Sequence, residues 1–92
     1  MTSSGLKQDY KIVYAKFVVK DIKDIENRSL KKIKSEIEKL AQFPDIENIR
    51  KLTNHPVSDF RMKVGDYRVL FDVDNNERVI FILKIGHRRE VY

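Results

Sequence analysis

Four cationic side chains in the last third of the sequence could cleave a phosphodiester. Arg61, Lys63 and Arg68 lie in two neighbouring apolar-rich runs, and Arg88 follows a third run near the C-terminus. To cut RNA without a metal, a site must take a proton from the 2′-hydroxyl, stabilise the charge of the phosphorane and protonate the leaving 5′-oxygen. Nearby arginines would disfavour the charged form of Lys63, and a lysine without its extra proton can act as a base.

The simpler interpretation of these cations is structural. Arg61 and Lys63 could be ordinary solvent-facing strand residues, and Arg68 could pair with Asp66 or Asp72. Under this interpretation the cluster contributes charge to the surface and performs no chemistry.

The two histidines offer a weaker alternative to the cationic cluster. Ribonucleases often use a pair of histidines, and this chain contains only His55 and His87. Their spacing gives no support for a pair, and we expect His55 to be a connector residue. The sequence contains no cysteine, which excludes disulfides and thiolate metal sites. We therefore expect neither a metal nor a cofactor.

Three predicted strands position the cationic cluster. The apolar-rich runs lie at residues 60–64, 67–73 and 79–85. A Gly-Asp corner and an Asp-Asn-Asn-Glu turn join them, a pattern typical of an antiparallel meander. Because side chains two apart share a strand face, Arg61, Lys63 and Arg68 are predicted to share one exposed face. The third run is almost continuously apolar, which indicates a central strand covered on both sides.

The first half of the chain predicts a strand and two helices. Residues 10–14 form a short strand, and apolar residues recur at helical spacing over residues 16–26. A longer helix follows, with Asn27 as its N-cap and Pro44 beyond its end. Its apolar stripe consists of Leu30, Ile33, Ile37 and Leu40. Residues 44–59 are expected to be an extended or turning connector.

This order of elements predicts an α+β fold. An N-terminal strand and a two-helix hairpin precede the three-strand antiparallel meander, so the helices should cover one face of the sheet. The other face is then free for function. We expect a single domain over residues 9–92, preceded by a flexible segment at residues 1–8.

Charge and hydropathy limit the class of partner. Nineteen Lys and Arg residues against 14 Asp and Glu residues give a net charge of +5, which favours an acidic partner such as nucleic acid. No run approaches the ~20 apolar residues that a membrane crossing needs, and the first residues do not have the pattern of a signal peptide. We therefore expect a cytoplasmic protein that has no membrane partner.

Three sequence motifs resemble the RelE branch of the RelE/ParE superfamily of bacterial and archaeal toxins. They are Lys51-Leu52, the stretch GDYRVLF at residues 65–71 and the stretch GHRREVY at residues 86–92. The likeness spans residues 10–92 and implies a small sheet backed by a helical hairpin. It also implies a ribosome-dependent endoribonuclease that cuts mRNA in the A site, and a RelB-like antitoxin that wraps the toxin and blocks it.

The resemblance also implies a role for individual residues. Lys63 matches the family's general-base lysine, and Arg68 matches its phosphate-binding arginine. Arg88 matches the general-acid arginine, and Tyr92 matches the tyrosine that stacks on a base and orients the substrate. The ribosome and its A-site mRNA would be the partners of these side chains.

At three positions the chain departs from the family or adds to its set of residues. Arg61 stands where RelE toxins often have lysine, so it can stabilise charge but is a poor base, and Thr53 replaces a basic residue of some relatives. His87 lies beside the proposed acid and could share proton transfer, because imidazole titrates near neutral pH. We expect the chain to end as a strand, which would place Arg88 and Arg89 on opposite faces.

Two other functions are compatible with the sequence. A ParE-like inhibitor of DNA gyrase would share the scaffold without needing acid and base groups, although the Arg-Met-Lys strand and the terminal Glu-Val-Tyr argue against it. A non-catalytic RNA-binding or protein-binding module would use the cations only to hold phosphates.

Overall fold

The computed structural model describes residues 9–91, so the segment at residues 1–8 and Tyr92 lie outside the described residues. The described part forms a five-stranded sheet in the order β1-β5-β4-β3-β2. Its elements are β1 (Lys11–Tyr14), α2 (Val18–Lys23), α3 (Asn27–Glu38), the 3₁₀ turn η1 (Lys39–Gln42), β2 (Ile49–Lys51), β3 (Phe60–Val64), β4 (Tyr67–Asp74), β5 (Val79–His87) and α4 (Arg88–Val91). The predicted α+β class is confirmed.

The antiparallel meander of β3, β4 and β5 is confirmed. Gly65 adopts a positive φ of 58° in the corner between β3 and β4, a conformation that glycine reaches at little cost. Strand β1 pairs in parallel with β5, so β5 lies inside the sheet between β1 and β4, as its apolar sequence predicts. Phe81 on β5 is nevertheless 38% exposed, so the expected cover on both sides of this strand is incomplete.

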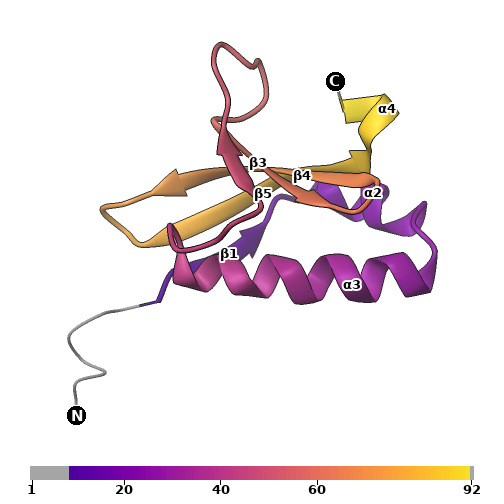
Figure 1. The fold of residues 1–92 in the computed structure, drawn as a ribbon, viewed down its shortest axis with the longest axis horizontal. Coiled ribbons are helices and arrows are strands. Elements are labelled where there is room, and N and C mark those ends of the chain that lie inside the picture. The colour runs from indigo at the N-terminus through magenta and orange to yellow at the C-terminus, as the bar shows by residue number, and fades with distance from the viewer. Residues whose placement is uncertain (1–8, 92) are drawn as a thin grey trace.

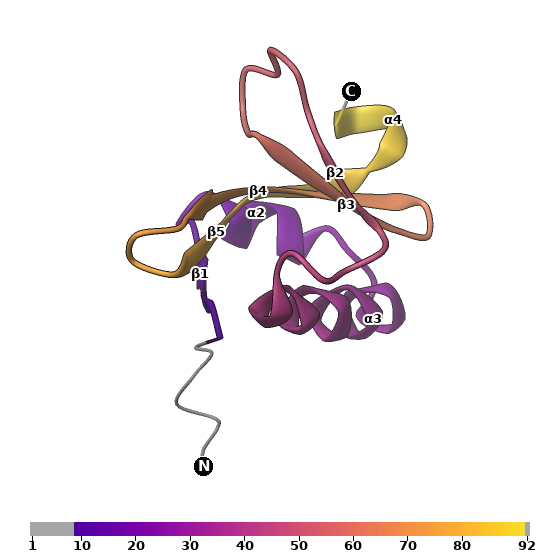
Figure 2. The ribbon, with the colours of Figure 1, turned by 60° about the vertical axis from the view of Figure 1, so that its left-hand side comes forward.

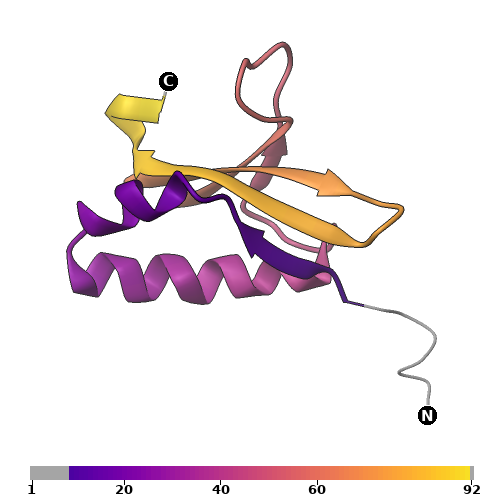
Figure 3. The ribbon, with the colours of Figure 1, turned by 180° about the vertical axis from the view of Figure 1, so that it is seen from behind.

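Helix α3 covers one face of the sheet. Figure 1 shows α3 running along this face, whereas the loop between β2 and β3 and the short helix α4 rise from the opposite side, and Figures 2 and 3 show the same division. The predicted stripe on α3 is confirmed, because Ile33 and Ile37 are buried. They pack in one cluster with Met62, Val69 and Phe71 from the sheet. The apolar stripe therefore fixes which face the helix covers.

The connector contains a strand that the sequence analysis missed. Strand β2 pairs antiparallel with β3, and Asn48 next to it exchanges hydrogen bonds with Lys63, donating from Nδ2 to the Lys63 carbonyl at 2.7 Å. The Asn48 carbonyl in turn accepts from the Lys63 N–H at 2.9 Å. Three residues are too few to show an alternating pattern, so tertiary pairing decides this strand.

The helix boundaries also differ from the sequence prediction. Helix α2 ends at Lys23, before the expected end at residue 26. Asn27 is the first residue of α3, and Glu26 occupies the N-cap position, where its Oε1 accepts a hydrogen bond from Ser29 Oγ at 3.1 Å. The helix then ends at Glu38 and tightens into η1 before Pro44. Competition between cap residues cannot be read from the sequence alone.

The C-terminal end is helical, and the expectation of a strand was wrong. Pairing between β4 and β5 ends at Tyr67 opposite His87, because β4 begins there. The next N–H, that of Arg88, donates instead to the Asp66 carbonyl at 2.8 Å, and the chain turns into α4. Arg88 and Arg89 are therefore separated by about 100° around a helix and do not lie on opposite faces of a strand.

Within residues 9–91, no helix is both long enough and apolar enough to cross a lipid bilayer.

Candidate active site

Four cations of strands β2, β3 and β4 share the face of the sheet that points away from α3, which we call the outer face. Lys63 on β3 lies directly opposite Arg68 on β4. Arg61 on β3 lies opposite Arg50 on the neighbouring strand β2. Side chains that face each other across an antiparallel pair have Cβ atoms about 4.5–5.5 Å apart. The predicted grouping of Arg61, Lys63 and Arg68 on one face is therefore confirmed, and Arg50 joins it.

The sequence analysis missed Arg50 because its strand was assigned to the connector. Ile49 lies opposite the buried Met62, so the next residue, Arg50, must point to the outer face. The only signal in the sequence was the short Ile-Arg-Lys-Leu run, and that signal is too weak to predict a strand.

The three predicted cations of the sheet differ sharply in exposure. Lys63 is exposed and Arg61 is half-buried. Arg68 is only 6% exposed, so its predicted place on an exposed surface was wrong. Alternation along a strand correctly assigns its face, but it does not reveal what covers that face. Lys63 is therefore the cation of this trio that is most accessible to a substrate.

Hydrogen bonds hold the buried guanidinium of Arg68 in place. Arg68 Nη1 donates to the carbonyl oxygens of Gly65 and Tyr67, each at 2.9 Å. Its Nε is buried and has no hydrogen-bond partner within residues 9–91. Asp72, a partner considered for Arg68, accepts a hydrogen bond from the Asp59 N–H at 2.6 Å. The Arg68 guanidinium thus fastens the corner between β3 and β4 and keeps a positive charge beside Lys63.

The outer face also contains a buried apolar residue. Leu70 on β4 is fully buried, yet it lies opposite Arg61 and Lys84 and outside the core cluster beneath the sheet. An apolar residue next to cations lowers the local dielectric, which strengthens their interaction with a phosphate. The buried Leu70 therefore gives the neighbouring cations an apolar setting suited to a developing negative charge.

Arg88 lies at the same end of the sheet as Lys63 and Arg68. Gly86 on β5 is in register with Arg68, and Arg88 follows two residues later. The hydrogen bond from its N–H to Asp66 ties the start of α4 to the corner that Arg68 fastens. The backbone of Arg88 therefore lies at the corner next to Lys63 and Arg68, and its side chain is exposed there.

His87 lies apart from this cluster. It is in register with Tyr67, and their rings make an edge contact with centroids 5.8 Å apart and planes at 74°. Tyr67 packs against the core on the side of α3. His87 Nδ1 accepts a hydrogen bond from the Arg89 N–H at 3.3 Å. The structure thus brings Arg61, Lys63 and Arg68 together, with Arg88 at their end of the sheet, and turns His87 to the other face.

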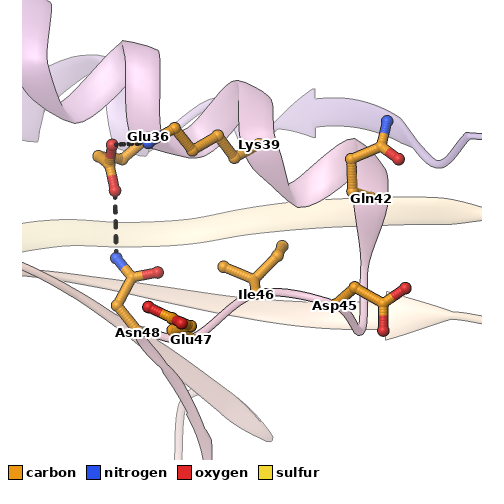
Figure 4. A pocket seen from close by; sticks show the side chains of 7 residues that line it. All are labelled: Glu36, Lys39, Gln42, Asp45, Ile46, Glu47 and Asn48. Carbon is orange, nitrogen blue, oxygen red and sulfur yellow. Dashed lines mark hydrogen bonds and ion pairs between the residues drawn. The ribbon is translucent and has the colours of Figure 1, made fainter.

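The remaining histidine and a pocket beside α3 are separate from the outer cations. His55 Nδ1 accepts a hydrogen bond from the Val57 N–H at 3.1 Å, a local contact in the loop between β2 and β3. A pocket of about 450 Å³ lies between α3 and residues 45–48 (Figure 4). Its carboxylate Glu36 is already engaged by Lys39 Nζ at 2.6 Å and by Asn48 Nδ2 at 3.3 Å. The one cation among the residues that line this pocket, Lys39, is already paired with Glu36, so the pocket does not offer a phosphate a cluster of cations.

A family model and a curated toxin match this chain over most of its length. The family model described as the ParE toxin of the type II toxin-antitoxin system, parDE, matches residues 6–92. The chain is 35% identical over 79 residues to the putative toxin RelE1 of Methanocaldococcus jannaschii, which covers 84% of this chain and 88% of that protein.

Two solved toxin-antitoxin complexes have a similar fold. The archaeal RelE-RelB complex from Pyrococcus horikoshii OT3 matches with a TM-score of 0.72 and 27% identity, over 89% of this chain and 98% of that chain. The RelBE2 complex from Mycobacterium tuberculosis matches with a TM-score of 0.76 and 21% identity, over 87% of this chain and 99% of that chain. At this lower identity the second match supports the fold alone.

Proposed function

Because the chain belongs to the RelE branch of the RelE/ParE superfamily of type II toxins, we propose that it is a ribosome-dependent endoribonuclease. It would enter the ribosomal A site, cleave the mRNA codon there and so stop translation. The reaction is attack of the ribose 2′-hydroxyl on the adjacent phosphate, with the chain's own side chains as acid and base. The proposed place of action is the cytoplasm, where translating ribosomes are found.

The observation that carries this proposal is the pairing of Lys63 with Arg68 across β3 and β4. Lys63 is exposed, and its Nζ makes no hydrogen bond or ion pair within residues 9–91, so the uncharged form of this amine is available to take the proton from the 2′-hydroxyl. Arg68 holds its charge beside that lysine and is the proposed phosphate-binding residue. Arg61 adds a second charge that stabilises the phosphorane.

The residues proposed to act on the leaving group lie at the C-terminal end of the chain. Arg88 is proposed to protonate or neutralise the leaving 5′-oxygen, and Tyr92, which lies outside the described residues, is proposed to stack on a base. His87 faces Tyr67 on the other side of the sheet, so we propose that it orients the start of α4 and supports proton transfer only indirectly.

Primer extension on a translated message tests this function. The purified chain should produce cuts confined to translated codons, and the same message without ribosomes should stay intact. A ParE-like gyrase inhibitor is the second candidate, because the matching family model carries the ParE description. Intact message together with gyrase-dependent DNA breaks would favour that candidate. Binding to RNA without cuts of either kind would favour a non-catalytic module.

We also propose a RelB-like antitoxin as partner. Two relatives of known structure are toxin-antitoxin complexes, by their descriptions. The net charge of +5 favours a partner rich in acidic, amphipathic helical sequence that folds on the toxin surface. Such a protein, encoded by a neighbouring gene, should co-purify with the chain from the native host. Harmless expression of the chain alone, with no co-purifying protein, would argue against the toxin assignment.

A further inference from the structure

The interior strand β5 extends beyond its neighbour β1 before it reaches the candidate site. Pairing between β1 and β5 ends with Tyr14 opposite Ile82, and the last hydrogen bond runs from the Ala15 N–H to the Ile82 carbonyl at 2.9 Å. Strand β5 continues for five more residues, to His87. On this edge, backbone groups beyond Ile82 need another partner, because a buried N–H without one is costly.

Asp21 on α2 supplies that partner. Its Oδ2 accepts a hydrogen bond from the Ile85 N–H at 3.0 Å, and Ile85 itself is only 2% exposed. The other carboxylate oxygen of Asp21, Oδ1, lies 3.8 Å from Lys84 Nζ. Figure 3 shows α2 beside this end of β5, with α4 continuing from it. A helical carboxylate therefore replaces the acceptor that β1 no longer provides.

The segment that Asp21 holds leads directly to the proposed catalytic residue Arg88. Ile85 is followed by Gly86, which is in register with Arg68, and then by His87 and Arg88. The far end of the segment is held by the hydrogen bond from the Arg88 N–H to the Asp66 carbonyl. Residues 85–88 are thus held by two hydrogen bonds, one to Asp21 on α2 and one to Asp66 in the corner between β3 and β4.

We infer that Asp21 is a positioning residue that holds residues 85–88 so that Arg88 meets the phosphate next to Lys63. This inference rests on the proposed function for its catalytic consequence. The chain offers a matched control in Asp24, which lines the same pocket of about 300 Å³ as Asp21 and His87. Asp24 is exposed, and its side chain makes no hydrogen bond to β5 within residues 9–91.

The test compares Asp21→Ala, Asp21→Asn and Asp24→Ala by amide hydrogen exchange and by single-turnover cleavage on programmed ribosomes. In Asp21→Ala, exchange at residues 85–88 should rise on the order of tenfold to a hundredfold, the loss expected for one hydrogen bond to a charged group. Exchange in β3 should stay unchanged. Asp21→Asn should restore protection, because its amide oxygen still accepts a hydrogen bond, and Asp24→Ala should resemble the wild type.

The cleavage assay separates positioning from a general loss of stability. The rate at saturating ribosome concentration should fall with Asp21→Ala and recover with Asp21→Asn, while the half-saturating concentration stays constant. Exchange that is unchanged in Asp21→Ala, or that rises equally throughout the sheet, would overturn the inference. If the wild type cuts no message but the local exchange pattern is seen, the positioning of residues 85–88 stands and the proposed function fails.

Discussion

The burial of Arg68 leads to a prediction about stability. Its Nη1 makes two hydrogen bonds of 2.9 Å to the Gly65 and Tyr67 carbonyls, and the side chain is only 6% exposed. Arg68→Ala would remove both hydrogen bonds and leave a cavity at the corner between β3 and β4. It would also remove a desolvated charge whose Nε has no partner within residues 9–91, which offsets part of the loss.

The expected size of this effect follows from these contacts. Hydrogen bonds to a charged group contribute about 1.5–3 kcal/mol, and after the offset we expect Arg68→Ala to lower the free energy of unfolding by about 2 kcal/mol. For a domain of this size, that loss corresponds to a fall in melting temperature of about 8–16 °C. Lys63→Ala is the matched control, because Lys63 lies directly opposite Arg68 but is exposed. It should change stability by no more than about 0.5 kcal/mol.

Thermal and urea unfolding followed by circular dichroism would measure both variants. We expect Arg68→Ala to lose stability and activity together, whereas Lys63→Ala should lose activity alone. A melting temperature for Arg68→Ala within two degrees or so of the wild type would refute the reasoning, since at about 4–8 °C per kcal/mol it would mean that the guanidinium contributes almost nothing to the corner.

Two further predictions concern the ends of the sheet. Arg88→Ala should lower the cleavage rate by about 10²–10³, the typical loss for one group that stabilises a developing charge. Arg89→Ala should lose much less, because the Arg89 side chain lies about 100° around α4 from that of Arg88; equal losses in single-turnover assays would contradict the placement of Arg88. Gly65→Ala should cost about 1 kcal/mol in urea unfolding, because φ is 58° and no heavy atom lies within 4 Å of the added Cβ. A larger loss would indicate a steric clash that the structure does not contain.

Most of the fold could be predicted because it follows strong local signals. The glycine corner at Gly65, the alternating strands around it and the stripe ending at Ile37 and Leu40 each specify an element through their own residues. Strand β2 and helix α4 could not be predicted in this way. The first depends on hydrogen bonds between Asn48 and β3, and the second on where β4 happens to begin.

The candidate site could be predicted only in part, for a related reason. Alternation assigns Lys63 and Arg68 to one face, but it gives no information on the carbonyl groups that bury Arg68. Arg50 was missed together with its strand. The contact between Asp21 and Ile85 joins a helix to a strand 64 residues later, and no pattern in the sequence predicts such a pair.

The most direct test of the central claim is single-turnover cleavage on ribosomes programmed with an mRNA that carries one 2′-deoxynucleotide at the cut position. We expect the wild type to cut the all-ribose message, leaving a 2′,3′-cyclic phosphate, and to spare the deoxy message. Lys63→Ala should cut the all-ribose message more slowly by about 10²–10⁴, the range for a lost general base. Cleavage of the deoxy message, or a Lys63→Ala rate equal to that of the wild type, would contradict the proposed reaction.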